Sequence, residues 1–197
     1  MSLQAGDVEL FLLKCAPLKL ATDAALHGDT VMQESSDIER DLRVSVSQFS
    51  SELRQTADAM AEFYKLFYMI ENDIRNLISD TLNDMYGPDW WDVKTPPSAK
   101  EECRANQQRE AEFGVTSRSD RELDYVSFGQ LGDIIRHNWD IFGGIISNQK
   151  ALGRVMHALN NLRGPIAHCG VLAEDEVDRL KLTVKDWFRL LEGPKAR

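Results

Sequence analysis

The sequence has few cysteines and no long apolar run, and each absence excludes a class of protein. Its 197 residues include three cysteines, Cys15, Cys103 and Cys169. An odd, widely spaced set of this kind builds neither a disulfide framework nor a zinc knuckle, so we expect a reducing, cytoplasmic setting. Lys14 and Lys19 interrupt the leucine-rich start. No membrane-spanning segment and no signal peptide is therefore expected.

Metal-ligand spacing and glycine-rich phosphate loops are also missing. No cluster of His, Cys, Asp and Glu has the spacing of a metal site, and Gly143-Gly144 lacks the surrounding pattern of a phosphate loop. We therefore predict no metal and no cofactor. Because no alternation of apolar and polar residues is long enough to build a sheet, the expected fold class is all-α.

Basic residues are outnumbered, and they are spread unevenly along the chain. The sequence has 23 Lys and Arg against 32 Asp and Glu, a formal net charge of −9. This balance argues against a protein that binds nucleic acid over a broad surface. Residues 136–170, however, contain one acid and four bases, a net of +3, together with three of the four histidines. This basic block is either a chance fluctuation or a local anion site.

A seam of apolar and small residues at alternating spacings of three and four predicts a very long N-terminal helix, or two helices nearly in line. It should end before Gly87-Pro88. The helix is either a core-facing member of a bundle or a dimerising coiled coil. The seam consists of Leu42, Val46, Phe49, Leu53, Thr56, Met60, Phe63, Phe67, Ile70, Ile74 and Leu77.

Other patterns predict further helices along the chain. Trp90-Trp91 should cap a core, and a Ser127/Gln130 capping box should begin a helix. The last helix should turn Val177, Leu180, Val184, Phe188 and Leu191 inward. The remaining expectations are a short helix or strand at Val8–Leu13, a Ser36/Glu39 capping box, a polar helix over 98–113, and helices over 148–162 and 174–191.

A segment near the end of the chain pairs an arginine with a histidine. Residues 159–170 read Leu-Asn-Asn-Leu-Arg-Gly-Pro-Ile-Ala-His-Cys-Gly. Arg163 and His168 are five residues apart, about 140° around a regular helix, so their side chains would diverge. Gly164-Pro165 should interrupt the helix, because proline lacks an N–H and clashes with the carbonyl four residues back. A kink at that point would aim both side chains toward one place.

Such a pair suits cleavage of RNA without a metal. Arginine offers a permanent, forked charge to phosphate, and histidine exchanges a proton near neutral pH. A base would take the proton of the ribose 2′-OH while a cation stabilises the anionic phosphorus. The alternative is that Gly164-Pro165 is a mere helix break in a structural protein that dimerises through the long seam. Cys169 is expected to be a small buried thiol.

An ordered set of motifs resembles the HEPN superfamily (higher eukaryotes and prokaryotes nucleotide-binding), and within it the Swt-type HEPN domain. Arg163-Gly-Pro-Ile-Ala-His168 resembles the R-x-x-x-x-H motif of this superfamily. The resemblance covers roughly residues 60–192, which predicts a HEPN-like helical domain over 60–197 and an N-terminal helical extension over 1–59. Supporting motifs are Ile70-Glu71-Asn72-Asp73-Ile74-Arg75, Tyr86-Gly87 before Trp90-Trp91, Leu123-Asp124-Tyr125, Leu131-Gly132-Asp133-Ile134-Ile135, Asn138-Trp139, Asn160 and Glu174-Asp175-Glu176-Val177.

The resemblance implies a helical bundle that forms a homodimer, with the motifs of two subunits facing one cleft. Active members are similar to metal-independent endoribonucleases that leave a 2′,3′-cyclic phosphate, and Arg163 and His168 would be the catalytic pair. Many members are toxins, antiviral effectors or RNA-processing enzymes that cut RNA and are restrained by a protein inhibitor or antitoxin. Others are inactive modules that bind RNA, a nucleotide or a protein, and this is the rival prediction.

Two positions depart from the family pattern. Gly164 stands where a polar residue, commonly asparagine, often follows the motif arginine, which puts a second catalytic polar group in doubt. Gly170 stands where one toxin subgroup has a tyrosine that a partner nucleotidyltransferase modifies, so that control should not apply. Residues 1–59 lie outside the resemblance and would be a dimerisation arm, a lid or a surface for an antitoxin.

Further residues are expected to support the site. The resemblance points Glu71 toward Arg163 or Arg75, unless Glu71 and Arg75 form only a surface pair one turn apart. Asn160 would bond free carbonyls at the kink or polarise the site. The others either contact RNA or form polar helix surface, and they are Arg136, His137, Arg154 and His157.

Overall fold

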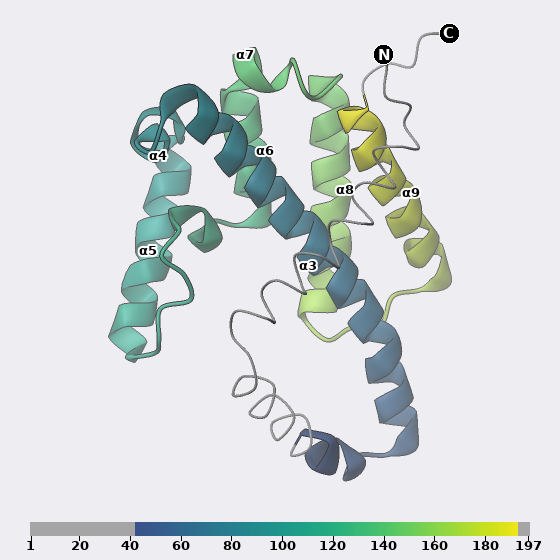
Figure 1. The fold of residues 1–197 in the computed structure, drawn as a ribbon. Coiled ribbons are helices and arrows are strands. Elements are labelled where there is room, and N and C mark those ends of the chain that lie inside the picture. Colours follow the sequence, from purple (N-terminus) through teal and green to yellow (C-terminus); the bar gives the residue numbers. More distant parts are fainter. Residues whose placement is uncertain (1–41, 193–197) are drawn as a thin grey trace, which may run out of the picture. The chain divides into compact units, whose positions relative to one another are not determined.

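The computed structural model describes residues 42–192, and every regular element in that range is a helix (Figure 1). The all-α prediction is confirmed, whereas the predicted elements at Val8–Leu13 and Ser36/Glu39 lie outside the described residues. None of the helices in this range is long and apolar enough to cross a membrane. The labelled helices are α3 (Ser51–Tyr86), α4 (Trp90–Lys94), α5 (Pro97–Phe113), the 3-10 helix η1 (Glu122–Tyr125), α6 (Phe128–His137), α7 (Trp139–Phe142), α8 (Gln149–Ala167) and α9 (Glu174–Leu191).

The chain divides into two compact units, Met1–Gln55 and Thr56–Arg197. In the first unit, residues 42–47 are helical, and residues 48–50 separate them from the start of α3. The predicted apolar seam therefore lies on two helices, and α3 alone has 36 residues. It ends at Tyr86, before Gly87-Pro88, as expected.

The buried face of α3 departs from the predicted seam at its C-terminal end. Phe67, Ile70 and Ile74 are buried as predicted, but burial then continues through Ile78 and Leu82, while Leu77 is only partly buried. From Phe67 to Leu82 the buried positions recur on average about every 3.75 residues, which is longer than the 3.5-residue repeat of a strict heptad seam. This half of α3 is thus a core-facing bundle helix.

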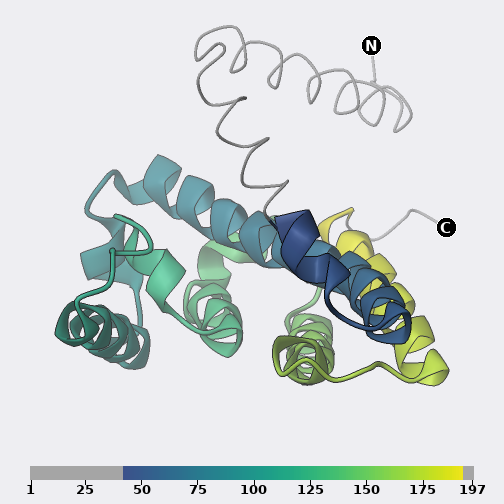
Figure 2. The ribbon, with the colours of Figure 1, turned by 90° about the horizontal axis from the view of Figure 1, so that it is seen from below.

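Within the unit Thr56–Arg197, α6, α8 and α9 lie side by side and α3 crosses one face of them (Figure 2). Their facing side chains form a hydrophobic core that includes Trp90, as predicted, and the fully buried Tyr125, Phe128 and Phe142. The polar helix predicted over 98–113 is α5, whose Ala99 and Cys103 are nonetheless buried. Helix α8 packs against both α6 and α9, and it carries Arg163 near its C-terminal end and His168 as its C-cap.

The start of α6 shows how tertiary contacts override a local cap. The helix begins after Ser127 as predicted, but the Ser127 side chain makes no capping hydrogen bond. Its hydroxyl lies 3.5 Å from the carboxylate of Glu102, and the Gln130 amide donates to the carbonyl of Ser98 at 3.3 Å. The predicted capping box is therefore wrong, because both side chains join α6 to α5 instead.

The inward face of α9 agrees with the prediction except at Phe188. Leu180 is buried and Val177, Val184 and Leu191 are partly buried against the core, as predicted. Phe188, which was predicted to face inward, is 51% exposed, whereas Trp187 and Leu190 are buried. The indole N–H of Trp187 donates to the carboxylate of Asp73 on α3 at 3.4 Å. A buried tryptophan needs a partner for this N–H, and Asp73 supplies one at the core edge.

Truncation of Trp187 tests this packing. We expect Trp187→Ala to lower the free energy of unfolding by about 3–5 kcal/mol, because it removes a large buried side chain and leaves a cavity. Phe188→Ala, on the adjacent exposed position, should change it by less than about 1 kcal/mol. Urea unfolding followed by circular dichroism measures both values. If Phe188→Ala lowers the free energy of unfolding as much as Trp187→Ala does, Phe188 packs inward as the sequence predicts.

Candidate functional site

Helix α8 continues through the Gly-Pro pair without interruption. It extends to Ala167 with Pro165 inside it, and the backbone N–H of His168 still bonds to the carbonyl of Gly164 at 3.1 Å. The predicted break and restart of the helix is therefore wrong. Proline removes one hydrogen bond, the one to the carbonyl of Asn161, but the bonds that follow it hold the last turn together.

A Schellman motif ends α8 and fixes the position of the motif histidine. His168 is the C-cap, the N–H of Gly170 bonds to the carbonyl of Pro165 at 2.7 Å, and the N–H of Cys169 bonds to the carbonyl of Ile166 at 3.2 Å. Cys169 has φ +58° at the position where glycine is usual. Its thiol is exposed, so the expectation of a buried thiol is wrong.

Glu71 on α3 lies between two arginines. Its Oε2 is 3.2 Å from Nε of Arg163, and its Oε1 is 2.5 Å from Nη2 of Arg75. The side chains of Glu71 and Arg75 are 13% and 11% exposed, whereas that of Arg163 is 42% exposed. Glu71 and Arg75 are thus not a solvated surface pair, and one carboxylate contacts both arginines that the sequence linked to it.

Arg75 carries this ion-pair network to the segment before α6. Its Nε donates to the carbonyl of Leu123 at 3.3 Å and lies 3.6 Å from Oδ1 of Asp124. Arg121 contacts the same carboxylate through two nitrogens at 2.9 and 3.0 Å. The network therefore joins α3, α8 and η1 at one place.

A pocket of about 420 Å³ opens at this network. Its lining includes the carboxylates of Glu71 and Asp124 and the aromatic rings of Tyr64 and Tyr68. Four arginines also line it: Arg75, Arg118, Arg121 and Arg163. This concentration of guanidinium groups makes the pocket a candidate site for an anion such as phosphate.

The electrostatics of the pocket keep the Asp124 carboxylate ionised. Partial burial opposes ionisation of Asp124, but hydrogen bonds from Arg121 and Ser119, together with the charges of Arg121 and Arg75, hold the pKa of Asp124 below its ordinary value. An ionised Asp124 in turn neutralises part of the arginine charge. The pocket is consequently an ordered array of opposite charges with an excess of cations.

His168 is not part of this pocket lining. It is exposed at the end of α8, whereas the pocket takes Arg163, Ile166 and Ala167 from the same helix. Because the helical hydrogen bonds continue to His168, positions 163 and 168 remain five residues apart along one helix, which corresponds to about 140°. Of the two side chains, only that of Arg163 lines this pocket.

The other residues of the basic block lie in different places. Arg136, His157 and Asn160 line a pocket of about 480 Å³ between α6 and α8. His157 contacts the Asn161 amide at 3.0 Å, and no hydrogen bond of the Asn160 side chain is found among the described residues. His137 is exposed at the end of α6 and lines neither this pocket nor the one at Arg163.

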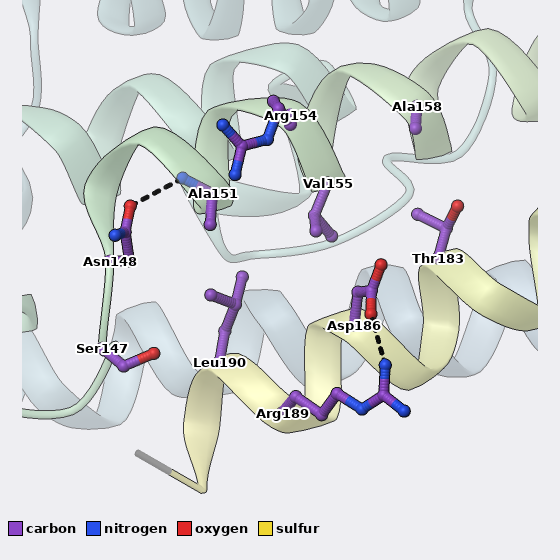
Figure 3. Close-up of a pocket in the computed structure, with 10 residues that line it drawn as sticks. All are labelled: Ser147, Asn148, Ala151, Arg154, Val155, Ala158, Thr183, Asp186, Arg189 and Leu190. Carbon is purple, nitrogen blue, oxygen red and sulfur yellow. Dashed lines mark hydrogen bonds and ion pairs between the residues drawn. The ribbon is translucent and has the colours of Figure 1, made fainter. Parts of the chain in front are cut away.

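Arg154 lines a further pocket of about 630 Å³ between α8 and α9. Figure 3 shows Arg154 on α8 and the ion pair between Asp186 and Arg189, 2.9 Å apart, on α9. The arginines of residues 136–170 thus face three separate pockets. Within one copy of the chain, the reading of this block as a single anion site is wrong.

Sequence reasoning missed two of the arginines beside Arg163. Arg118 and Arg121 lie in the polar stretch between α5 and η1, which has no periodicity and no motif. Arg118 forms an ion pair with Glu110 and lies over the ring of Tyr125, 5.1 Å from its centroid. The only signal in the sequence was the concentration of charge around residues 118–124.

Among residues 42–192, no group of three or more His, Cys, Asp and Glu side chains is arranged to hold a metal ion. Comparison with protein families matches residues 65–192 to the Swt1-like HEPN family. Comparison with curated proteins and with solved structures gives no match. The match covers α8 with Arg163 and His168, and also Glu71, Arg75 and the 118–124 segment.

The left-handed cysteine yields a prediction about stability. We expect Cys169→Gly to raise the free energy of unfolding by about 0.5–1 kcal/mol, because relief of left-handed strain exceeds the added flexibility of the unfolded chain. Gly114→Ala is the matched reverse change, since Gly114 ends α5 at φ +65° with no atom near its added Cβ. It should cost about 1 kcal/mol. Urea unfolding measures both, and destabilisation by Cys169→Gly would refute the assigned strain.

Acid titration tests the Asp124 network. The folded protein holds the Asp124 pKa below the value of about 3.9 of an unfolded chain. Its carboxylate therefore stabilises the fold above that pH, and the stabilisation is lost as the pH falls through the folded-state pKa. Wild type should be more stable than Asp124→Asn at neutral pH, and the difference should shrink below about pH 4. A difference that stays constant in urea unfolding at both pH values would contradict the network.

Proposed function

The chain belongs to the Swt1-like HEPN family, and from this we propose that it is a metal-independent endoribonuclease whose catalytic residues are Arg163 and His168. The observation that carries the proposal is the position of Arg163. Its side chain is 42% exposed at a pocket with three other arginines, and Glu71 contacts the guanidinium through one nitrogen. The remaining N–H groups of a forked guanidinium stay free to bind phosphate.

In the proposed reaction, the imidazole of His168 takes the proton of a ribose 2′-OH, and that oxygen attacks the adjacent phosphorus. Arg163 stabilises the negative charge that develops on the phosphate oxygens. The bond from phosphorus to the 5′-oxygen of the next nucleotide breaks, and this oxygen receives a proton. The products are a 2′,3′-cyclic phosphate and a 5′-hydroxyl, and Glu71 acts as a positioning residue for Arg163.

We propose that two copies of the chain form the site. Positions 163 and 168 are about 140° apart around a helix, and only Arg163 lines the arginine pocket, so one copy does not supply both side chains to that pocket. In a homodimer, Arg163 of one copy could act with the partner subunit's His168. The exposure of both residues on the surface of a single copy supports this arrangement.

Regulation by a protein is part of the proposal. A toxin, a defence effector or an RNA-processing enzyme that cuts RNA in the cytoplasm needs restraint, and an inhibitor or antitoxin would supply it. A formal net charge of −9 favours a basic inhibitor over an acidic one. The same charge would keep RNA away from most of the surface and leave the arginine-lined pocket as the attractive place.

The rival is an inactive HEPN module that binds RNA, a nucleotide or a protein without cleavage. Gly164 favours this rival, because the position next to the motif arginine has no polar side chain. A Cβ built on Gly164 meets no atom within 4 Å. Gly164→Asn should therefore fold normally, and a gain of cleavage only in that variant would identify the natural chain as the inactive module.

Cleavage of tRNA and mRNA in the presence of EDTA tests the main proposal. We expect wild type to give cyclic-phosphate ends, and Arg163→Ala or His168→Ala to lower the rate by about 10²–10⁴-fold, because each removes a transition-state interaction. Arg154→Ala is the matched control, since it removes an exposed arginine from another pocket of α8. Equal cleavage by wild type and both motif variants would refute the assigned residues.

Mixed dimers then test the shared site. Arg163→Ala and His168→Ala chains, each inactive alone, should regain part of the activity when they are mixed, because one pairing restores an intact Arg163 opposite the partner subunit's His168. Light scattering measures the dimer in the same samples. A mixture of dimers that stays inactive would contradict a site shared in this way.

A further inference from the structure

Two tyrosines beside Arg163 are far more exposed than aromatic side chains of a core. Tyr64 and Tyr68 lie one turn apart on α3, and they are 63% and 60% exposed. Their ring centroids are 6.4 Å apart and the planes are tilted by 34°. Both line the pocket that contains Arg163. A contiguous exposed aromatic pair of this kind marks a binding surface more often than it contributes to stability.

Two further residues of the same pocket carry positive charge that is only partly neutralised. Arg118 and Arg121 have side chains that are 51% and 50% exposed. Glu110 contacts Arg118, and Asp124 and Asn76 contact Arg121. These contacts use only some of the five N–H groups of each guanidinium, and the remaining ones are available to a ligand. Arginines fixed in this way bind phosphate with little loss of side-chain freedom.

The charges of the pocket leave an excess of positive charge that attracts phosphate. Two carboxylates, Glu71 and Asp124, lie among the four lining arginines, and the Glu110 carboxylate neutralises Arg118 from outside. Three acids against four arginines leave an excess of one positive charge. The pocket thus has one cationic part and one aromatic part, the two chemistries that a nucleotide unit presents.

We propose that Tyr64 and Tyr68 form a base-stacking subsite, on which an unpaired nucleobase of the RNA lies while a neighbouring phosphate binds Arg118 and Arg121. This inference rests on the proposed function, because it places the flanking nucleotide beside the phosphate at Arg163. Unpaired bases stack on aromatic side chains, whereas the bases of a duplex are already stacked on one another. Stacking tolerates any base, so the subsite selects single-stranded RNA and not a sequence.

We expect the aromatic rings of Tyr64 and Tyr68, and not their hydroxyl groups, to provide the affinity for RNA. Tyr64→Phe with Tyr68→Phe keeps both rings, whereas Tyr64→Leu with Tyr68→Leu keeps apolar side chains and removes the stacking surface. One stacked base strengthens binding by roughly 10- to 100-fold. We therefore expect the Leu pair to weaken binding by at least about 10-fold and the Phe pair to stay within about 3-fold of wild type.

Fluorescence anisotropy of the full chain with a labelled, unstructured RNA of about 12 nucleotides measures this effect. A 2′-O-methyl group on every ribose prevents cleavage, so binding is measured apart from catalysis. A second RNA of the same length has several abasic positions. Wild type and the Phe pair should bind the intact RNA more tightly than the abasic RNA, and the Leu pair should bind both equally. Phe188→Leu on α9, which removes a ring that is 51% exposed outside this pocket, is the matched control.

Three results would overturn the subsite. The Leu pair could bind the intact RNA as tightly as wild type does, or it could lose the same affinity for the intact and the abasic RNA. The third result is a Phe pair that binds as weakly as the Leu pair. If the Leu pair loses the same affinity for both RNAs and is a monomer in light scattering, the tyrosines form a contact between copies of the chain instead. The outcome is separable from the cleavage test. If binding depends on the rings and no RNA is cleaved, the stacking subsite stands and the nuclease proposal fails. If RNA is cleaved and binding does not depend on the rings, the nuclease proposal stands and the subsite fails.

Discussion

The Glu71 carboxylate is the group on which the candidate site depends. It is almost buried on α3, and it contacts Arg75 and Arg163 at the same time. Arg75 is itself almost buried, so without Glu71 its remaining acidic partner among the described residues is Asp124 at 3.6 Å. A buried charge that loses its partner is costly, which makes this carboxylate a structural requirement as well as a positioning group. Because α3, α8 and the segment before α6 meet at it, the location of Arg163 follows from this cluster.

The ends of the helices could be predicted from the sequence better than their faces. Glycine and proline set the end of α3, and acidic residues set the start of α9, as local chemistry requires. Trp187 and Phe188 show the limit, because adjacent aromatic residues fit either of two helical phases, and the choice depends on Asp73, distant in sequence. The Ser127 cap failed for the same reason, since Glu102 and Ser98 draw its side chains away.

Only part of the candidate site could be predicted from the sequence. The motif that contains Glu71 predicted its contacts with Arg75 and Arg163, because these three residues lie on regular helices. The basic block of residues 136–170 was misleading, since a helix distributes neighbouring charges around its circumference. The cations that do gather beside Arg163 come from α3 and from the 118–124 segment. Their convergence depends on tertiary folding, which a count along the chain does not represent.

The end of α8 fixes the backbone of His168 even though Pro165 lies inside the helix. Pro165 removes one helical hydrogen bond but fixes its own φ, and its carbonyl accepts the bond from Gly170 that closes the Schellman motif. A Cβ on Gly170 would lie 3.1 Å from that carbonyl oxygen, so glycine is the residue that fits this close approach. His168 is therefore held at its backbone while its side chain remains exposed. Strain retained at Cys169, the next residue, is typical of functional sites. A fixed backbone with an exposed imidazole is what the proposed site between two copies of the chain requires.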